Sequence, residues 1–343
     1  MTQWQTFLSN RKAETTEGRV QHFGNPSDEL QATANGTILA DLSHFGLLQI
    51  EGEDRISFLQ GQVTNDVKLL TGNNSHYAGY CTPKGRLLAL FMAFAHHDHL
   101  HLQLNRELLE PIMKRLKMYV MRSKVSITDV SDTIIRMGLA GPQATQLLQS
   151  LFNQVPEKAQ DLVSLDDASL IRLPGNPPRF EIFTTPEHAE RIWNVLVQQA
   201  TMVGVPCWDW LEIQAGIPEI YPNTQEAFVP QMINLDALSG INFKKGCYTG
   251  QEIVARTHYL GKVKRRTLLT HIPATENPAI GSAIYATGTE EAIGVLVRVA
   301  PSPAGGWDAL AEVRLEVIEG AKLTLDKAGQ TALELRELPY SLN

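Results

Sequence analysis

The pattern of residues changes at Lys264, and this change limits the fold more than any other feature of the chain. From there onward, short stretches of alternating apolar and polar residues are separated by glycine, proline and aspartate, as in 282–288, 292–300 and 308–318. Alternation with a period of two is typical of β-strands that bury one face. Many short strands of this kind favour a closed antiparallel sheet. We therefore expect a separate C-terminal β-barrel.

The first part of the chain mixes helical and strand patterns. Residues 38–52 predict two short strands around a turn, and 53–62 predict a helix that starts with acidic capping residues. The stretch 76–105 predicts a meander of strands with polar turns, the second of them at His96 to His99. Residues 106–120 have the spacing of an amphipathic helix. This part therefore combines a sheet with helices.

Strands and helices alternate in the middle of the chain, which is typical of a split β-α-β module. The patterns predict strands at 134–140, 168–173 and 180–184 and helices at 142–152 and 186–200. We therefore expect an α+β protein in three parts: an N-terminal α+β part at 1–122, a second α+β part at 123–262, and the β-barrel at 263–343.

The apolar runs are too short for a membrane protein. The longest, 87–95, falls well below the length of a bilayer-spanning helix, and residues 1–20 lack the apolar core of a signal peptide. We therefore expect a cytoplasmic protein. Its three cysteines, Cys81, Cys207 and Cys247, are odd in number and far apart, so we expect free thiols and no cysteine metal site.

Positive charge is concentrated in one stretch of an acidic chain. Residues 241–270 hold seven lysines and arginines against Glu252, a net charge of +6. The whole chain has a formal charge of -7, so the remaining residues carry -13. An anionic ligand is drawn to such a region, although a basic run of this kind is also common on a solvated face.

The segment 243–252, FKKGCYTGQE, places a cysteine inside this basic stretch. Lys244, Lys245 and a helix beginning near Gln251 would each stabilise a thiolate at Cys247. A cysteine in a turn between glycines can equally be a small structural residue. From the residues alone, both interpretations stay open.

The same segment resembles the K-G-C-Y-x-G-Q-E signature of YgfZ-type folate-binding, tRNA-modifying proteins, whose eukaryotic relatives assist mitochondrial iron-sulfur cluster assembly. The resemblance extends over nearly the whole chain. It also covers, in the expected order, the segments FLQGQVTNDV (58–67), PKGRLLA (83–89), EIQAGIPEI (212–220), FVPQMINLDALSGINF (228–243) and ELPYSLN (337–343).

The wider superfamily includes the T-protein of the glycine cleavage system and dimethylglycine-oxidising enzymes, which bind tetrahydrofolate in a central channel between three domains. The resemblance thus implies two α+β folate-binding-type domains around a channel, plus a C-terminal antiparallel β-barrel. It also implies tetrahydrofolate or a folate derivative as cofactor.

Two departures from the T-proteins argue against aminomethyl transfer. The hairpin corresponding to 83–92 carries a catalytic aspartate in those enzymes, whereas this chain has Leu88 or Ala89 there. Cys247 likewise stands where their K-x-D-F-I-G segment has an aspartate. The resemblance is compatible with folate binding and leaves open whether the chain catalyses any reaction.

Two aromatic residues correspond to tryptophans that are thought to contact folate in YgfZ-type proteins. Trp208 matches, while Phe45 replaces a tryptophan, which keeps a stacking face but removes the indole donor. Without the resemblance, each is equally well explained as an ordinary core residue.

The cations of the segment suit the carboxylates of a polyglutamate tail, and equally a phosphate or an RNA backbone. We assign this role to Lys244, Lys245 and Arg256, with Arg266 as a further candidate. Tyr248 and Gln251 would support the loop or touch the ligand, and Cys247 would be the functional thiol.

The resemblance implies a folate-binding protein that supports iron-sulfur cluster assembly or repair in client enzymes, such as a radical-SAM tRNA methylthiotransferase. Nothing in the sequence demands more than a monomer. One alternative is a tetrahydrofolate-dependent one-carbon transferase with Cys247 as nucleophile and His258 as proton shuttle. A second is direct tRNA binding through residues 262–266 and Tyr259. The absence of an RNA-binding motif and the net acidity of the remaining chain count against the second.

Overall fold

A computed structural model of the chain describes residues 2–259, 261, 263–287, 289–318 and 321–342. The chain forms two compact units, each built from several stretches of sequence. Unit 1 comprises Met1–Phe58, Lys68–His76 and Met92–Leu211, and unit 2 comprises Leu59–Val67, Tyr77–Phe91 and Glu212–Asn343. The three-part division at 122/123 and 262/263 stays a prediction, and Lys262 lies outside the described residues.

Unit 1 contains a six-stranded sheet with the order β10-β11-β12-β9-β3-β13. Its strands are antiparallel except for the parallel pair β13 and β3. They span β3 Ile38–Asp41, β9 Ile135–Ala140, β10 Leu162–Ser164, β11 Ala168–Leu173, β12 Arg179–Thr184 and β13 Thr201–Val203.

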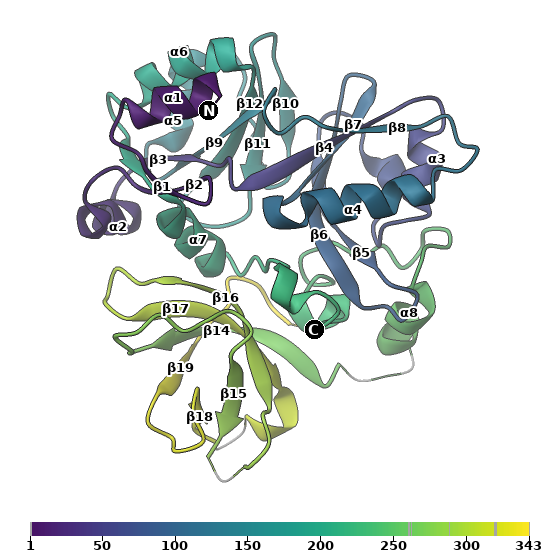
Figure 1. Ribbon diagram of the computed structural model, residues 1–343, viewed down its shortest axis with the longest axis vertical. Coiled ribbons are helices and arrows are strands. Elements are labelled where there is room, and N and C mark those ends of the chain that lie inside the picture. Colours follow the sequence, from purple (N-terminus) through teal and green to yellow (C-terminus); the bar gives the residue numbers. More distant parts are fainter. Residues whose placement is uncertain (1, 260, 262, 288, 319–320, 343) are drawn as a thin grey trace. The chain divides into compact units, whose positions relative to one another are not determined.

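Helices α1 (Gln3–Ser9), α5 (Ala144–Leu151) and α6 (Pro186–Leu196) bury their apolar faces in the core beside this sheet (Figure 1). Trp193 of α6 is completely buried, and the edge of its ring meets Trp4 of α1 at a centroid distance of 5.4 Å. Two further helices of the chain are α2 (Pro26–Asn35) and α7 (Val205–Gln214).

A second sheet has the order β5-β6-β7-β4-β8. Its strands span β4 Phe45–Glu51, β5 Ser75–Cys81, β6 Leu87–His96, β7 His99–Asn105 and β8 Ser126–Asp129. Helix α4 (Arg106–Met118) approaches β4 so closely that a Cβ on Gly46 would lie 2.3 Å from Leu109 Cδ1. The ribbon β1 (Glu14–Thr16) and β2 (Arg19–His22) precedes both sheets in the chain, and α3 (Arg55–Gln60) follows β4.

Unit 2 contains a closed antiparallel barrel with the order β14-β17-β16-β15-β18-β19. The strands span β14 Arg265–Ile272, β15 Ala283–Ala286, β16 Gly294–Pro301, β17 Trp307–Arg314, β18 Leu323–Thr324 and β19 Ala332–Arg336. Inward-facing residues such as Ile284, Leu296 and Val313 form its core. The barrel that the alternating pattern predicts is thus confirmed, as is the α+β class of the chain.

The rest of unit 2 holds parts of β5 and β6 together with loops and short helices. It contains the 3-10 helices η2 (Pro222–Thr224) and η3 (Pro230–Ile233) and helix α8 (Gln251–Tyr259). The expected helix near Gln251 is therefore present. Within the described ranges, none of the helices combines the length and the apolar character needed to cross a bilayer.

Candidate functional site

The cysteine loop, which we define as residues 243–250, connects the turn after η3 to the start of α8. Cys247 and its neighbour Gly246 are exposed, whereas Cys81 and Cys207 are buried. Burial raises the pKa of the Cys81 and Cys207 thiols to about 12 in each case. The thiol of the family signature is thus the accessible one among the three cysteines.

Lys245 anchors one side of the loop. Its ammonium donates to the backbone carbonyl oxygens of Gln60 at 2.7 Å and Val63 at 2.5 Å, and lies 4.9 Å from the ring centroid of Tyr248. Burial lowers the pKa of Lys245 to about 8. Because the charge is taken up by carbonyls within the fold, Lys245 is an anchor instead of the ligand-facing cation that the sequence suggested.

Gly250 anchors the other side. Its φ is +86°, and a Cβ there would lie 2.4 Å from the carbonyl oxygen of Thr82 and 2.9 Å from Cα of Gly85. Gly85 closes the turn before β6 with φ +68° and donates its N–H to Thr82 O at 2.9 Å. Two glycines therefore let the backbone of this turn touch the backbone that opens α8.

Segments 58–67 and 228–243 meet beneath the loop through side chains that satisfy turn carbonyls. Thr64 Oγ1 donates to Gly240 O at 2.6 Å, and the Thr64 carbonyl accepts from the N–H of Asn242 at 3.0 Å. The amide of Asn65 donates to Ser239 O at 2.8 Å and Tyr77 O at 2.9 Å. The family motifs that are scattered along the sequence are therefore neighbours in unit 2.

The last motif also reaches this region. Tyr340 donates its hydroxyl hydrogen to Gly216 O at 2.7 Å, in a segment that also resembles the family. Gly216 has φ +68°, and a Cβ there would lie 2.6 Å from the Tyr340 ring. The motifs at 212–220 and 337–343 thus fit each other through a glycine and a tyrosine.

Two arginines of the basic stretch are neutralised within unit 2. Arg266, which is buried, donates to Asp236 through both terminal nitrogens at 2.6 and 3.0 Å, and Arg265 pairs with Glu312. This corrects the expectation that Arg266 serves as a free cation for an anionic ligand. Lys262, the first residue of the expected tRNA-binding stretch, lies outside the described residues.

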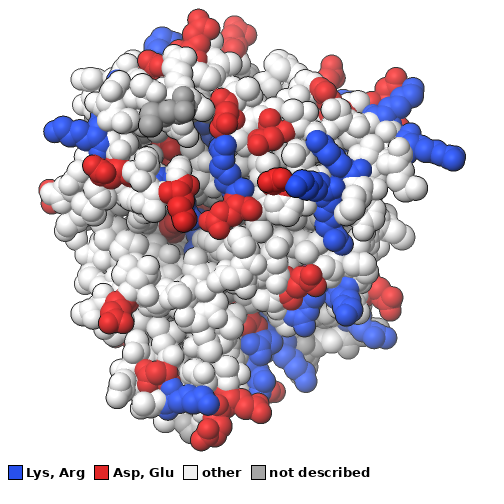
Figure 2. Space-filling model, in the orientation of Figure 1, with Lys and Arg blue, Asp and Glu red and all other residues white. Residues whose placement is uncertain are grey.

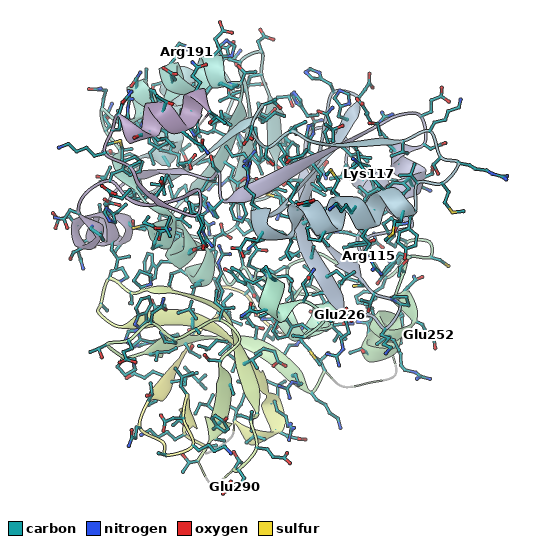
Figure 3. All side chains as sticks on the ribbon, in the orientation of Figure 1. Arg115, Lys117, Arg191, Glu226, Glu252 and Glu290 are labelled. Carbon is teal, nitrogen blue, oxygen red and sulfur yellow. The ribbon has the colours of Figure 1, made fainter. Side chains whose placement is uncertain are left out.

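Exposed positive charge remains on Lys244, Arg256 and Lys264. In Figure 2, lysine and arginine side chains gather at the lower right, in the region of α8 and the start of the barrel. Glu252, labelled on α8 in Figure 3, is an exposed carboxylate among them. The exposed cations Lys244 and Arg256 and the thiol of Cys247 thus lie on the cysteine loop and on the helix α8 that follows it.

The other residues that the sequence assigned to the loop have mixed environments. Tyr248 is buried, which raises the pKa of its hydroxyl, and the nearby Cys81 adds to the shift. Gln251 is half-buried at the first position of α8. His258, the candidate proton shuttle, is exposed and stacks on Phe243 with ring centroids 3.7 Å apart. Tyr248 and Gln251 are therefore placed to support the loop.

The two predicted aromatic contacts of folate belong to unit 1. Trp208 has no exposed surface, because its ring lies against Gly138, and the Arg179 guanidinium lies 5.1 Å from the ring centroid. Its indole N–H has no hydrogen-bond partner among the described residues. Phe45 is also buried, at 7% exposure, and its ring centroid lies 4.1 Å from that of His44. Both rings are core residues here, so neither presents an open stacking face.

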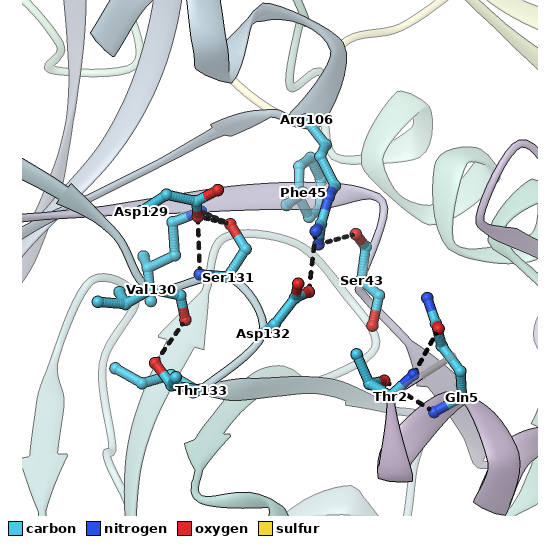
Figure 4. Close-up of polar contacts among 12 residues, drawn as sticks. Thr2, Gln5, Ser43, Phe45, Arg106, Asp129, Val130, Ser131, Asp132 and Thr133 are labelled. Atoms are coloured by element: carbon cyan, nitrogen blue, oxygen red, sulfur yellow. Dashed lines mark hydrogen bonds and ion pairs between the residues drawn. The ribbon is translucent and has the colours of Figure 1, made fainter.

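A cavity of about 250 Å³ lies within unit 1, and His44, the neighbour of Phe45 in the chain, lines it. Arg106 donates to Asp132 Oδ1 at 2.8 Å and to Ser43 O at 3.5 Å (Figure 4). The lining includes Arg19, Ser43, His44, Arg106, Glu107 and Asp132. Sequence reasoning missed this cavity, although Arg106 directly follows Asn105, the β7 residue that pairs with Phe45 of β4.

The hairpin position that is acidic in T-proteins is apolar and buried. Leu88 and Ala89 have exposed fractions of 7% and 0%. The Leu88 carbonyl accepts from the side-chain amide of Gln225 at 2.8 Å. At this position the chain therefore carries no carboxylate that could assist one-carbon transfer.

Comparison with known proteins agrees with this description. Residues 6–243 match the model of the GCVT N-terminal domain. The tRNA-modifying protein YgfZ of Hamiltonella defensa is 35% identical over 260 residues, 76% of each chain, and that of Yersinia enterocolitica is 31% identical over 307 residues, 89% of this chain and 92% of the relative.

The solved structure of the glycine cleavage system aminomethyltransferase T from Bartonella henselae has the same fold. It superposes with a TM-score of 0.76 at 18% identity, covering 97% of this chain and 96% of that one. Together with the motifs that meet around Cys247, these matches show that the chain belongs to the GCVT domain family and, within it, to the family of tRNA-modifying proteins YgfZ.

Proposed function

We propose that this chain is a folate-binding protein that supports the assembly or repair of iron-sulfur clusters in client enzymes and thereby tRNA modification, including methylthiolation. It acts in the cytoplasm as a monomer. The relatives named tRNA-modifying protein YgfZ support the tRNA part of this proposal. The observation that carries it is the exposed Cys247 on a loop held from both sides by Lys245 and Gly250.

A thiol on a fixed, exposed loop suits exchange of a ligand with another protein. The thiolate is the form that attacks disulfides and binds metals. Iron-sulfur clusters usually take four protein ligands, and the described residues hold no group of three or more His, Cys, Asp or Glu placed to bind a metal. Cys247 therefore contributes one ligand to a cluster whose other ligands come from the client, or protects the client's cluster through thiol chemistry.

Folate requires a flat pocket, a few polar groups and cations for its glutamate tail. Two features of unit 1 suit it: the cavity of about 250 Å³ and the two arginines, Arg19 and Arg106, that line it. On unit 2, Lys244 and Arg256 are exposed cations whose charge suits an anionic group such as a glutamate tail. Folate would supply a one-carbon carrier, and these residues would bind and orient it.

The one-carbon transferase remains a second candidate, with Cys247 as nucleophile. Its support is the accessible thiol alone, since His258 stacks on Phe243 and the hairpin position that is acidic in T-proteins is apolar. Direct tRNA binding has less support, because Arg265 and Arg266 are paired with carboxylates.

The test is complementation in cells that lack the homologous protein, with tRNA methylthiolation measured by mass spectrometry of nucleosides. Wild type, Cys247→Ala and Cys207→Ala are compared at equal protein level, since Cys207 is a buried thiol that serves as the matched control. We expect wild type and Cys207→Ala to restore the modification and Cys247→Ala to fail.

Full restoration by Cys247→Ala would overturn the role of the thiol. Folate binding is tested separately by titrating 5-formyltetrahydrofolate into the wild type and into Arg106→Gln and Arg256→Ala variants. Unchanged affinity in both variants would remove these arginines from the proposed site.

A further inference from the structure

A second cavity of unit 1, separate from the residues assigned to folate, lies at the turn between β6 and β7. Its volume is about 380 Å³, within the range of small-molecule sites in proteins. Its walls come from the ends of β6, β7 and β12 and from the segment 164–169. The sequence marks this turn by an unusual run of histidines, HHDHLH at 96–101, which the proposed function does not use.

His101 is the unusual residue of this cavity. Its side chain is 2% exposed and stacks on Phe94 with ring centroids 5.0 Å apart. Neither ring nitrogen has a hydrogen-bond partner among the described residues. Buried polar atoms without partners cost free energy, so an imidazole left this way inside a cavity suits a ligand that supplies the missing partners.

The remaining walls combine aromatic rings and hydroxyl groups. Phe94 packs on Phe183 at a centroid distance of 4.8 Å, and both line the cavity. His96 Nδ1 lies 3.1 Å from Ser164 Oγ and 3.0 Å from Ser169 Oγ. A flat ring would therefore meet apolar faces with hydrogen-bonding groups at its edges.

The charges of the cavity select against anions. Asp166 and Asp167 line it, and no lysine or arginine does so among the described residues. Asp167 pairs with Arg191, which projects from α6 (Figure 3), while Asp166 is exposed. Burial lowers the pKa of His101 to about 3, with the charges of His96 and His99 adding to the shift, so this imidazole is neutral at neutral pH.

We infer that this cavity binds an uncharged, amino-substituted heteroaromatic ring. A neutral imidazole has one N–H donor and one acceptor nitrogen. An aminoheteroaromatic edge carries both an acceptor nitrogen and an amino donor, so it can bond to the His101 nitrogen that faces it in either tautomer, while its remaining N–H faces the Asp166 carboxylate or a serine hydroxyl. The ring itself packs against Phe94 and Phe183.

The test uses adenine as probe, titrated into the full-length protein by calorimetry, with purine and AMP as matched comparisons. Purine lacks the amino group and AMP adds an anion. We expect adenine to bind, and purine and AMP each to bind at least about fivefold more weakly, as expected for the loss of one hydrogen bond or for repulsion by a carboxylate.

His101→Phe keeps a ring against Phe94 but removes both nitrogens. We expect this variant to bind adenine at least about tenfold more weakly than wild type. The control is His99→Phe, a residue of the same turn that does not line the cavity, which should change the affinity less than about twofold. If His101→Phe does not fold, Asp166→Asn at the exposed rim replaces it and should raise the affinity for AMP towards that for adenine.

Three outcomes would overturn the inference: no binding of adenine by wild type up to about 10 mM, equal affinity for purine and adenine, or equal losses in the two histidine variants. Because none of these residues belongs to the cysteine loop, the complementation result with Cys247→Ala is independent of all three.

Discussion

The ammonium of Lys245 lies 2.7 Å from the backbone carbonyl oxygen of Gln60, 185 residues earlier in the chain. Gln60 is the last residue of α3, where carbonyl groups lack partners within the helix and carry partial negative charge. A buried cation therefore satisfies a helix end and at the same time fixes the start of the cysteine loop. The position of the thiol depends on this long-range contact.

Replacing Lys245 by methionine should destabilise unit 2. The change leaves the carbonyls of Gln60 and Val63 without their charged donor, and each such hydrogen bond contributes about 1.5–3 kcal/mol. We expect a clear decrease in the midpoint of urea unfolding. Lys244→Met, which alters an exposed neighbour, is the control and should shift the free energy of unfolding by less than about 0.5 kcal/mol. Equal shifts in the two variants would contradict the anchoring role.

Replacing each of the two glycines on either side of Cys247 by alanine should change the free energy of unfolding by different amounts. Gly250→Ala introduces a Cβ 2.4 Å from Thr82 O at φ +86°, so we expect a loss of at least about 2 kcal/mol in the free energy of unfolding. A Cβ on Gly246 meets no atom within 4 Å, and that variant should unfold like wild type. Similar free energies of unfolding for both variants would show that the backbone at Gly250 and Thr82 can move apart at little cost.

Thiol reactivity should separate the three cysteines. In the native protein we expect a maleimide reagent to label Cys247 rapidly and to leave Cys81 and Cys207 unmodified, because both are buried with raised pKa values. In denaturant all three should react. Peptide mass spectrometry identifies the labelled sites, and fast native labelling of Cys81 would mean that the sheet strand β5 opens readily.

The histidine cavity should make stability depend on pH. His101 has a folded pKa of about 3 against an ordinary value of 6.5, so the unfolded chain binds a proton between these values and the folded chain does not. Protonation therefore favours the unfolded chain in this range. The free energy of unfolding is unaffected by the titration of His101 above pH 6.5 and decreases as the pH falls towards 3. Relative to His101→Phe, we expect wild type to lose about 2 kcal/mol between pH 7.5 and 5.

Urea unfolding of both proteins at several pH values measures this difference. The other ionisable groups around the cavity are His96, His97, His99, Asp166 and Asp167, and they are the same in both proteins. Parallel pH curves for wild type and variant would show that His101 titrates normally.

Much of the fold follows from local patterns. Alternating residues after Lys264 predict the barrel, and the amphipathic spacing of 106–120 predicts α4. The cysteine signature predicts a loop followed by a helix, which the structure has at α8. These predictions succeed because strand and helix periodicity depend on neighbouring residues.

The details of the site could not be predicted in this way. In the sequence Lys245 and Arg266 are simply positive charges near a cysteine, and nothing local shows that the carbonyls of Gln60 and Val63, or the carboxylate of Asp236, will bind them. Trp208 similarly looks like a stacking residue until Gly138 is seen to lie against its ring. Each of these environments is made by a distant segment.

The chain moves from one compact unit to the other after residues 58, 67, 76, 91 and 211. No single cut in the gene can therefore separate the units into two continuous polypeptides. Within residues 1–211 the chain alternates between the units, so exchanging a segment of the gene there would divide at least one unit. A frameshift late in the gene would remove Tyr340 and, with it, a support of the distant Gly216 turn. Unit 1 is thus complete once residue 211 has been translated, whereas unit 2 needs the rest of the chain.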